Sequence, residues 1–488
     1  MAAVLFYFAW LCLVSRNLAN EQEYYNIIAF KDSLADEHVA PLGKGGSALL
    51  YRVYGVSGLY RFLCSLLVAV GLLMLLVVAE ASGITSYPAL VSPDYWLKQN
   101  TQGEQLVLDA KGISSLNSKI ASLSRTVYDM TTYPATYSGD ALKTRIMNYQ
   151  ALEDDLYLNG NKVSENYKNI LRAQTNIKAI PNTVTVRYAV TTTRAAIRNL
   201  PTGQGLFYYA ADKDFDVLQE TMLDPGEPVA ILHQSANGYF YYVQSYNYSG
   251  WISRFNVGLT DKKTWLQFAK PKEFLVVTDA KYALKVGKNE VLYQQGARLP
   301  LVAEQPALYT VEVPQKLPNG NLQKHKVNVP KLAKAVHKGY LPYTSNNIVR
   351  SAFRFYGMPY GWGGLKDSVD CSALILNAYR TVGIYLPRNT DEQANTAGVR
   401  TLLDGLDKAQ RTAVLKDLQP GAALYMDGHV LLYLGQIKGE PYCIHALGSY
   451  YVKGERQREM HVVVSDLTLQ RSSGNSLLED LHTAVEFK

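Results

Sequence analysis

The chain has 488 residues and a formal net charge of +7, with 48% hydrophobic and 19% charged residues. This length exceeds what one hydrophobic core supports and predicts roughly three or four domains, and the composition excludes a largely disordered chain. The positive charge favours acidic polymers as partners. Anionic cell wall fits as well as nucleic acid, but no recognised nucleic-acid motif supports the latter.

The numbers of tyrosines and cysteines further limit the kind of protein this can be. The 36 tyrosines, against 13 phenylalanines, indicate many half-buried β positions or a wet surface that faces sugar or peptide. The four cysteines are too few for a disulfide framework, and they occur in no CxxC or Cys/His spacing. We therefore expect neither a zinc site nor any other cofactor.

A strongly apolar segment lies well inside the chain. Arg61 precedes the mostly apolar run Phe62–Ala79, and Ala79-Glu80-Ala81 supplies a small-x-small cleavage site. This is the anatomy of a secretory signal peptide over residues 59–81, or of an uncleaved signal anchor, because such a run can just span a bilayer. We prefer the signal peptide, with residues 1–58 as an uncertain leader from an over-extended gene start.

Residues 82–180 carry a helical pattern. Apolar residues recur at steps of three and four in two segments, which predicts amphipathic helices that pack against each other. We expect a helical N-terminal domain without a site of its own. The recurring residues are Ile113, Leu116, Ile120, Leu123 and Val127, then Leu142, Ile146, Tyr149, Leu152 and Leu156.

After Pro181 the pattern changes to short strands with turns that contain glycine. Asn237-Gly238 separates two strand-like runs, which predicts a hairpin and a small barrel over residues 181–259. Asn319-Gly320 predicts a second hairpin inside a second barrel over residues 260–340. We expect both units to bind or to act as spacers rather than to catalyse.

Residues 341–488 return to mixed helix and strand. Ile348–Tyr356 predicts a short helix, and a glycine-rich loop then leads to a second helix that starts near Cys371. Short apolar strands broken by glycine and proline follow, as in an antiparallel sheet. The fold class predicted for this region is α+β, with the helix packed on the sheet.

Cys371 lies where a thiol nucleophile is expected. Asp370 can cap the helix that follows, so the cysteine lies in its first turn, where unpaired N–H groups and the macrodipole favour negative charge. Such a position can lower a thiol pKa from about 8.5 to about 3.5–7.5. The alternative is a small buried hydrophobic residue, which is the commoner role of a lone cysteine.

Two histidines can complete a catalytic set with Cys371. His429 starts one predicted strand and His445 lies on the next, so antiparallel pairing can bring the two imidazoles side by side. A nucleophilic thiol needs a base, and the base needs a third group that fixes its tautomer. A single histidine on a strand is more often structural, but the combination favours catalysis.

Five motifs occur in the order seen in the NlpC/P60 family of papain-like cysteine peptidases. The resemblance covers about residues 345–465, and the upstream regions resemble a known arrangement of a helical stabilising domain followed by two bacterial SH3-type barrels. The motifs are Tyr360-Gly361-Trp362-Gly363-Gly364, Asp370-Cys371-Ser372, Leu386-Pro387-Arg388, Gly428-His429-Val430 with Tyr433-Leu434-Gly435, and Ile444-His445-Ala446.

The resemblance implies hydrolysis of the γ-D-glutamyl–diamino acid bond in murein peptides, in the periplasm or cell envelope, without a cofactor. It makes Cys371 the nucleophile, His429 the general base and acid, and His445 the orienting residue, with Tyr360 near the oxyanion. In relatives of this layout the first barrel selects a free N-terminal L-Ala. The candidate substrate-binding residues are Trp362, Asp370, Ser372, Asp214 and Asp216.

Two features depart from the family pattern or extend it. Ala373 stands where the family commonly has glycine, and its methyl group is expected to narrow the groove. Cys443 lies two residues before His445 and hence on the same strand face. It is expected to be core, with an inactivating disulfide to Cys371 as a hypothesis.

Two other functions stay open from the sequence. One is a protein that binds cell wall with an idle peptidase domain, and the other is a papain-like amidase or acyltransferase on another substrate. The expected partners are murein stem peptides or their fragments, without nucleic acid, and the expected membrane contact is only through the signal or anchor.

Overall fold

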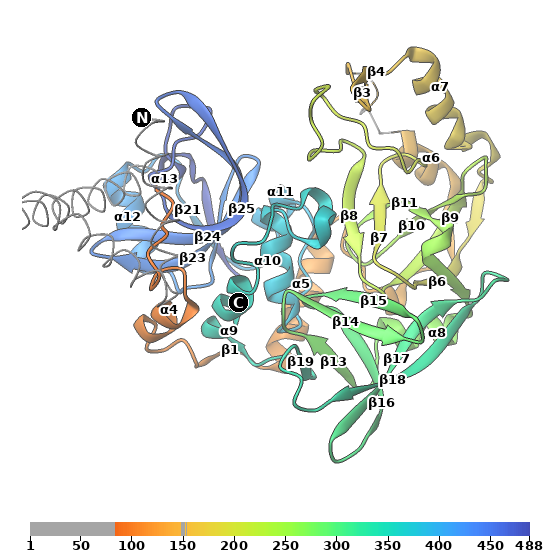
Figure 1. The fold of residues 1–488 in the computed structure, drawn as a ribbon, viewed down its shortest axis with the longest axis horizontal. Helices are drawn as coiled ribbons and strands as arrows, with labels where there is room; N and C mark the ends of the chain where they lie inside the picture. Colours follow the sequence, from red (N-terminus) through yellow and green to blue (C-terminus); the bar gives the residue numbers. More distant parts are fainter. Residues whose placement is uncertain (1–82, 148–151, 153) are drawn as a thin grey trace, which may run out of the picture. The chain divides into compact units, whose positions relative to one another are not determined.

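The structure, a computed structural model, describes residues 83–147, 152 and 154–488 (Figure 1). The leader predicted over residues 1–58 and the signal sequence predicted over 59–81 lie outside these ranges. All described residues belong to one compact unit. Within the described ranges, no helix is long and apolar enough to cross a membrane.

The described part of residues 83–180 is helical only in part, and its apolar residues enter cores shared with later parts of the chain. The predicted pattern from Ile113 to Leu123 lies in one helix, whereas the helix that holds Leu142 ends at Met147, so the prediction is wrong for Leu152 and Leu156. Leu116 and Ile120 pack in the core of the C-terminal region, Leu142 in the core of the first set of strands, and Leu171 beside Leu206. The elements are α4 (Pro93–Gln99), α5 (Ala110–Leu123), α6 (Gly139–Met147) and α7 (Glu165–Gln174), the 3₁₀ turns η1 (Met130–Thr132) and η2 (Ile177–Ala179), and the short strands β1 (Leu106–Leu108), β2 (Thr136–Ser138), β3 (Tyr157–Leu158), β4 (Asn161–Lys162) and β5 (Thr183–Thr185).

The first β-unit, strands β6 to β12, forms a sheet in the order β12-β6-β9-β10-β11-β7-β8. The hairpin predicted around Asn237-Gly238 is confirmed, since β9 and β10 pair antiparallel across it. Trp251 is fully buried in the core of this unit. The strands are β6 (Arg187–Thr191), β7 (Ala195–Arg198), β8 (Gln219–Leu223), β9 (Pro228–Gln234), β10 (Phe240–Gln244), β11 (Ser249–Ser253) and β12 (Val257–Thr260), and β11 is followed by η3 (Arg254–Asn256).

The second β-unit, strands β13 to β19, follows α8 (Lys262–Ala269). Its sheet has the order β18-β17-β16-β13-β19, and β14 and β15 form a separate hairpin. The long hairpin predicted around Asn319-Gly320 is confirmed by the antiparallel pairing of β17 with β18. The strands are β13 (Phe274–Val277), β14 (Lys281–Val286), β15 (Asn289–Gln294), β16 (Arg298–Glu304), β17 (Leu308–Lys316), β18 (Leu322–Pro330) and β19 (Val336–Lys338).

The C-terminal region packs the buried helix α10 on a sheet in the order β21-β26-β22-β23-β24-β25. Leu374 and Ile375 of α10 share a core with Val430 and Ile444 of the sheet, as the predicted α+β arrangement requires. The elements are β20 (Tyr343–Thr344), α9 (Ser345–Phe353), η4 (Trp362–Asp367), α10 (Cys371–Arg380), α11 (Thr390–Ala394), β21 (Val399–Leu402), α12 (Lys408–Lys416), β22 (Ala423–Met426), β23 (His429–Ile437), β24 (Glu440–Val452), β25 (Glu455–Asp466), α13 (Leu477–Asp480) and β26 (Thr483–Glu486).

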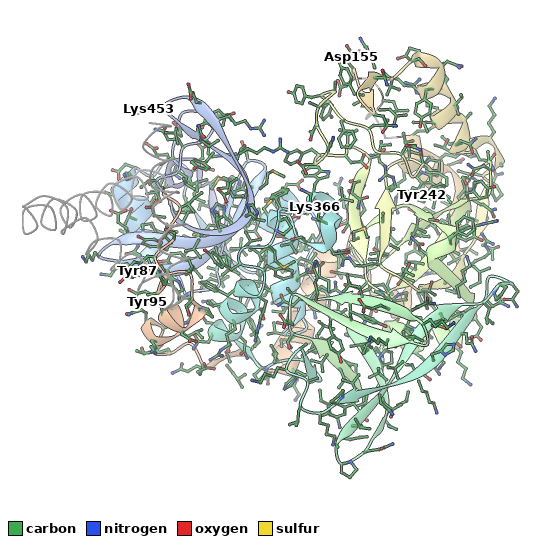
Figure 2. The ribbon with its side chains drawn as sticks, viewed as in Figure 1. Tyr87, Tyr95, Asp155, Tyr242, Lys366 and Lys453 are labelled. Carbon is green, nitrogen blue, oxygen red and sulfur yellow. The ribbon has the colours of Figure 1, made fainter. Side chains whose placement is uncertain are left out.

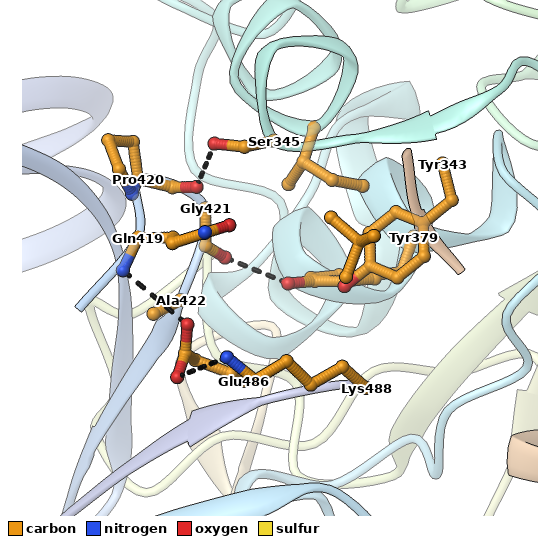
Figure 3. Close-up of a pocket in the computed structure, with 11 residues that line it drawn as sticks. Tyr343, Ser345, Tyr379, Gln419, Pro420, Gly421, Ala422, Glu486 and Lys488 are labelled. Atoms are coloured by element: carbon orange, nitrogen blue, oxygen red, sulfur yellow. Dashed lines mark hydrogen bonds and ion pairs between the residues drawn. The ribbon is translucent and has the colours of Figure 1, made fainter. Parts of the chain in front are cut away.

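A small pocket beside Tyr379 shows how α10 is held near its C-terminal end (Figure 3). The Tyr379 hydroxyl donates a hydrogen bond of 2.9 Å to the Gly421 carbonyl in the turn before β22. Ser345 at the start of α9 donates to the Pro420 carbonyl of the same turn. Because buried carbonyl groups need partners, these bonds link both helices to the sheet.

Candidate active site

The start of α10 is capped as the sequence predicts. Asp370 has an extended backbone, and its Oδ1 accepts a hydrogen bond of 2.9 Å from the Ala373 N–H. Cys371 is therefore the first residue of the helix, and it is only 7% exposed. A carboxylate at this position satisfies one of the N–H groups that an α-helix leaves unpaired.

Asp370 also forms a buried ion pair that connects the helix start to the first β-unit. Arg388 donates to both carboxylate oxygens, at 3.2 and 2.6 Å, and donates a further bond of 2.8 Å to Ser372 Oγ. Its Nε donates to Thr221 Oγ1 of β8 at 2.8 Å. Asp370 and Ser372 are nearly buried beneath the thiol, so both support the helix start, and their predicted contact with substrate stays a prediction.

The glycine-rich loop lets the first β-unit lie directly against the site. Gly363 has φ +54°, and a Cβ there would lie 2.7 Å from Gln219 Cγ. The Gln219 side chain donates a hydrogen bond of 2.8 Å to the Gly363 carbonyl, while the Gly363 N–H donates to Asp370 Oδ2 at 3.0 Å. A larger residue at this position would push β8 away from the helix start.

The surroundings of the Cys371 thiol raise its pKa, although a helix start can lower the pKa of a thiol. Burial and the adjacent Asp370 carboxylate raise the pKa to about 11, although hydrogen bonds from the Val430 backbone and the Thr390 side chain favour the thiolate. Water that would solvate a thiolate is excluded, and the carboxylate that caps the helix opposes the macrodipole.

Tyr360 contacts the thiol from the other side. Its side chain is hydrogen-bonded to Cys371, and burial together with that contact raises the Tyr360 pKa well above its usual value. Phe215 of the first β-unit packs against the Tyr360 ring, with 5.9 Å between the ring centroids. The phenol therefore stays neutral and keeps a proton to donate.

The two imidazoles lie side by side, as the strand pairing predicts. His429 Nε2 lies 2.9 Å from His445 Nδ1, and His445 Nε2 lies 3.0 Å from Ser465 Oγ of β25. Burial lowers the His429 pKa to about 4, with a further contribution from Arg471. Burial and the neighbouring His429 lower the His445 pKa well below its usual value, so both rings are neutral at pH 7.

The start of β23 brings the Val430 backbone, but not the histidine pair, into contact with the nucleophile. His445 shares a strand face with Cys443, on the side of the sheet away from α10. Val430, whose backbone is hydrogen-bonded to the Cys371 thiol, directly follows His429 in the chain. In the described part of the chain, no hydrogen bond joins the thiol itself to His429 or His445. Transfer of the thiol proton to His429 therefore requires a rearrangement of the imidazole around the start of β23.

The hypothesis of a disulfide between Cys371 and Cys443 is wrong. Both cysteines are free thiols, and they belong to different cores. Ile444 faces α10, and because neighbouring residues on a strand point to opposite sides, Cys443 points to the far side of the sheet. The sequence indicates which residues share a face but not which face α10 covers.

The two carboxylates of the first β-unit predicted to select substrate have partners within the protein. Asp214 accepts from Lys366, labelled in Figure 2, at 2.5 Å, and also pairs with Arg458. Asp216 pairs with Arg198 at 2.9 Å and accepts from the backbone of its own loop. Their role in substrate selection stays a prediction, and the contacts shown here fix the loop to the C-terminal region.

Trp362 is the most accessible of the predicted substrate-binding residues, at 36% exposed. Its indole N–H donates to the Asp216 carbonyl at 3.0 Å, and its ring meets Phe215 edge-on at 5.6 Å. The indole is thus fixed in position with part of its surface open to solvent.

Sequence reasoning did not single out Glu220 and Tyr248, which form a hydrogen-bonded pair near Arg388. The Tyr248 hydroxyl donates to Glu220 Oε2, while Asn199 donates to Oε1 at 2.8 Å. Tyr248 lies close enough to Asn389 and Arg388 to interact with both. Tyr248 directly precedes β11, the strand that holds Trp251, which is a weak signal in the sequence. No local pattern singles out Glu220.

The structure gives no indication of a metal centre in residues 83–147, 152 and 154–488. No group of three or more His, Cys, Asp or Glu side chains in these ranges is arranged to hold an ion.

Comparisons with known proteins identify two parts of the chain. A model of the NlpC/P60 family matches residues 357–465, and a model of the SH3 domain (SH3b1 type) matches residues 206–253. The SH3 match lies in the first β-unit, and the interpretation of the second β-unit as another SH3-type barrel stays a prediction.

Curated relatives and a solved structure extend this likeness. Dipeptidyl-peptidase 6 of Lysinibacillus sphaericus is 26% identical over 217 residues, 43% of this chain and 75% of that protein. A gamma-D-glutamyl-L-lysine dipeptidyl-peptidase of Bacillus subtilis (strain 168) is 24% identical over 200 residues, 38% of this chain and 57% of that protein. An NlpC/P60 endopeptidase from Photobacterium damselae subsp. piscicida aligns with a TM-score of 0.65 at 19% identity, over 79% of this chain and 94% of the other, and this likeness concerns the fold alone. The chain therefore carries a domain of the NlpC/P60 family together with an SH3 domain of the SH3b1 type.

Proposed function

We propose that this protein is an exported cysteine peptidase that hydrolyses the γ-D-glutamyl–diamino acid bond of murein stem peptides. The observation that carries the proposal is the placement of Cys371 in the first turn of α10, beside the strand that starts with His429. The curated relatives are named as peptidases, one of them for a γ-D-glutamyl-L-lysine bond, which supports this substrate class. The signal sequence predicted over residues 59–81 supports export.

In the proposed reaction, Cys371 Sγ attacks the γ-carbonyl carbon of D-glutamate while its proton passes to His429. The proton then moves to the departing amine of the diamino acid, and a thioester remains on Cys371. Water attacks the thioester with His429 as base, which releases the γ-carboxylate and restores the thiol. Tyr360 lies against the thiol, where its hydroxyl can donate to the oxyanion.

The histidine pair sets the direction of this proton transfer. His429 Nε2 faces His445, so Nδ1 is the nitrogen that remains for the thiol proton. Nε2 must then carry hydrogen and donate to His445 Nδ1, and His445 Nε2 must donate to Ser465. Ser465 thereby acts as a positioning residue that holds both rings in the required tautomers.

We also propose that Glu220 and Tyr248 bind the free amino group at the substrate N-terminus. Glu220 is half-buried, and its two oxygens accept from neutral donors only, so its negative charge stays available to an ammonium group. Tyr248, which donates to Glu220, interacts with Arg388, and Arg388 binds Asp370 at the start of α10. Charge-assisted hydrogen bonds of this kind are about twice as strong as neutral ones.

The direct test is to incubate the protein without its signal with L-Ala-γ-D-Glu-diaminopimelate and analyse the products by mass spectrometry. We expect L-Ala-D-Glu and diaminopimelate as products, and loss of cleavage in Cys371→Ala because the nucleophile is removed. Cys443→Ala is the matched control and should keep activity, since Cys443 lies on the far side of the sheet. No cleavage by the wild-type protein, or undiminished cleavage by Cys371→Ala, would defeat the proposal.

The raised thiol pKa predicts the pH dependence of Cys371 alkylation. Only the thiolate reacts with iodoacetamide, so with a pKa of about 11 the rate should rise by about tenfold per pH unit from pH 7 to 10. The alkylation rate of Cys371 is obtained by subtracting the rate measured for Cys371→Ala from that of the wild-type protein, which removes the contribution of other thiols. A rate that levels off below pH 8 would show that the resting thiol is already ionised.

Loss of the Ser465 hydroxyl should weaken catalysis without weakening substrate binding. In Ser465→Ala we expect kcat to fall by about tenfold or more with little change in KM, because His445 and then His429 lose their fixed tautomers. Ser465→Thr should restore most of the activity. Ser351→Ala removes another buried serine hydroxyl, bonded to Thr381 at 3.2 Å, and serves as the control. Equal kcat losses in both alanine variants would indicate a purely structural role for Ser465.

Substitution of Glu220 should separate substrates by their N-termini. In Glu220→Gln, kcat/KM for a free-amino substrate should fall by about tenfold or more, because a buried charge-assisted bond is lost. The already poor cleavage of the N-acetylated peptide should change little. Asp214→Asn tests the competing carboxylate, and a selective loss in that variant instead would assign recognition to Asp214.

A further inference from the structure

A large cavity lies at the end of α10 away from Cys371. Its volume is about 850 Å³, and its walls come from α5, from both β-units and from the segments 340–343 and 382–385. The ten residues of α10 correspond to about 15 Å of helix, so the cavity and the thiol are at opposite ends of one rigid element. Small-ligand sites commonly have volumes of about 300–1,000 Å³.

Arg298 of β16 brings a cation to this cavity without a carboxylate partner. It donates one hydrogen bond of 3.1 Å, to the Ala269 carbonyl, and among the described residues it forms no ion pair. Glu227 is close enough to Arg298 to interact with it, but it is bound by Arg380. Arg298 is half-buried, and four of its five N–H donors remain for a ligand.

The cavity has further charged groups of both signs. Asp109 caps α5 through a bond of 2.8 Å from the Gly112 N–H, and Asp129 accepts from Thr131 at the start of η1. Lys270 is exposed and forms no ion pair among the described residues. Among the described residues, Asp109 and Asp129 accept only from neutral donors, so two carboxylates and two basic groups of the cavity lack an ion-pair partner, and selection of an anion here would depend on Arg298 itself.

An aromatic surface adjoins the guanidinium. Arg298 lies 5.9 Å from the Phe274 ring centroid and 5.6 Å from that of Tyr385. The hydroxyls of Tyr340 and Tyr385 are hydrogen-bonded at 2.5 Å, and the Tyr385 N–H donates to Asn117 of α5 at 2.9 Å. The rings are therefore held in place, and flat apolar faces beside hydroxyl groups suit the faces of a pyranose ring.

We propose that this cavity is a second binding site, which takes an amino sugar that bears a carboxylate, with Arg298 paired to that carboxylate. Arginine binds carboxylates through two parallel hydrogen bonds, and the tyrosines contact the sugar ring. The choice of an acidic wall sugar, N-acetylmuramic acid, rests on the proposed function. Binding can be measured without turnover, so failure of this site and failure of the peptidase activity are separate results.

The test uses the full chain with Cys371→Ala and follows ligand binding by NMR or calorimetry. N-acetylmuramic acid and N-acetylglucosamine are the probes, because they differ only by the lactyl ether that carries the carboxylate. We expect the acidic sugar to bind and the neutral one to bind at least tenfold more weakly. Equal affinity for the two sugars, or no binding of either, would overturn the proposal.

Arg298→Gln should reduce the affinity for N-acetylmuramic acid by about tenfold or more, and Arg298→Lys by less, since lysine keeps the charge but loses the paired donors. Arg187→Gln is the control, because Arg187 packs over Tyr241 at 5.1 Å and does not line the cavity. If Arg298→Gln does not fold, Ser114→Trp on the exposed face of α5 fills the cavity and should abolish binding. Unchanged affinity in Arg298→Gln or in Ser114→Trp would contradict the site.

Discussion

Arg388 donates two hydrogen bonds to Asp370 in a buried pair that also reaches Ser372 and, through Thr221, the first β-unit. Burial of two charges is costly unless their geometry is complete, and removal of one partner from such a pair typically costs about 3–5 kcal/mol. Here every guanidinium nitrogen has a partner. The same pair fixes the cap of α10, the first turn that holds Cys371 and the wall of the site that faces β8, so the position of the nucleophile depends on two parts of the chain at once.

Burial also determines the protonation state of the reacting groups. It raises the thiol pKa of Cys371 to about 11 and lowers the imidazole pKa of His429 to about 4, so both groups are neutral over the whole physiological range. A resting thiolate–imidazolium pair is therefore disfavoured. The proton transfer belongs to the chemical step, in which Val430, Thr390 and Tyr360 surround the sulfur.

Sequence patterns predicted those parts of the site in which the interacting residues are close together in the chain. The cap at Asp370 follows from helix periodicity, and the meeting of His429 with His445 follows from strands joined by a turn. Contacts between residues that are far apart in the sequence are not indicated by any local pattern. Nothing in the sequence near Arg388 indicates that it binds both Asp370 and Thr221. Asp214 belongs to a recognisable sequence motif, whereas Glu220 does not. The raised thiol pKa depends on burial, which a helix-start motif does not contain.

The central claim, that Cys371 attacks the γ-carbonyl of a murein peptide, is tested most directly with a chloromethyl ketone of L-Ala-γ-D-Glu. The reagent places an electrophile where the scissile carbonyl would lie, and peptide mapping by mass spectrometry locates the adduct. The account predicts one adduct, on Cys371, and much slower labelling by the N-acetylated reagent. An inactivated enzyme in which Cys371 is unlabelled and another residue carries the adduct would contradict it.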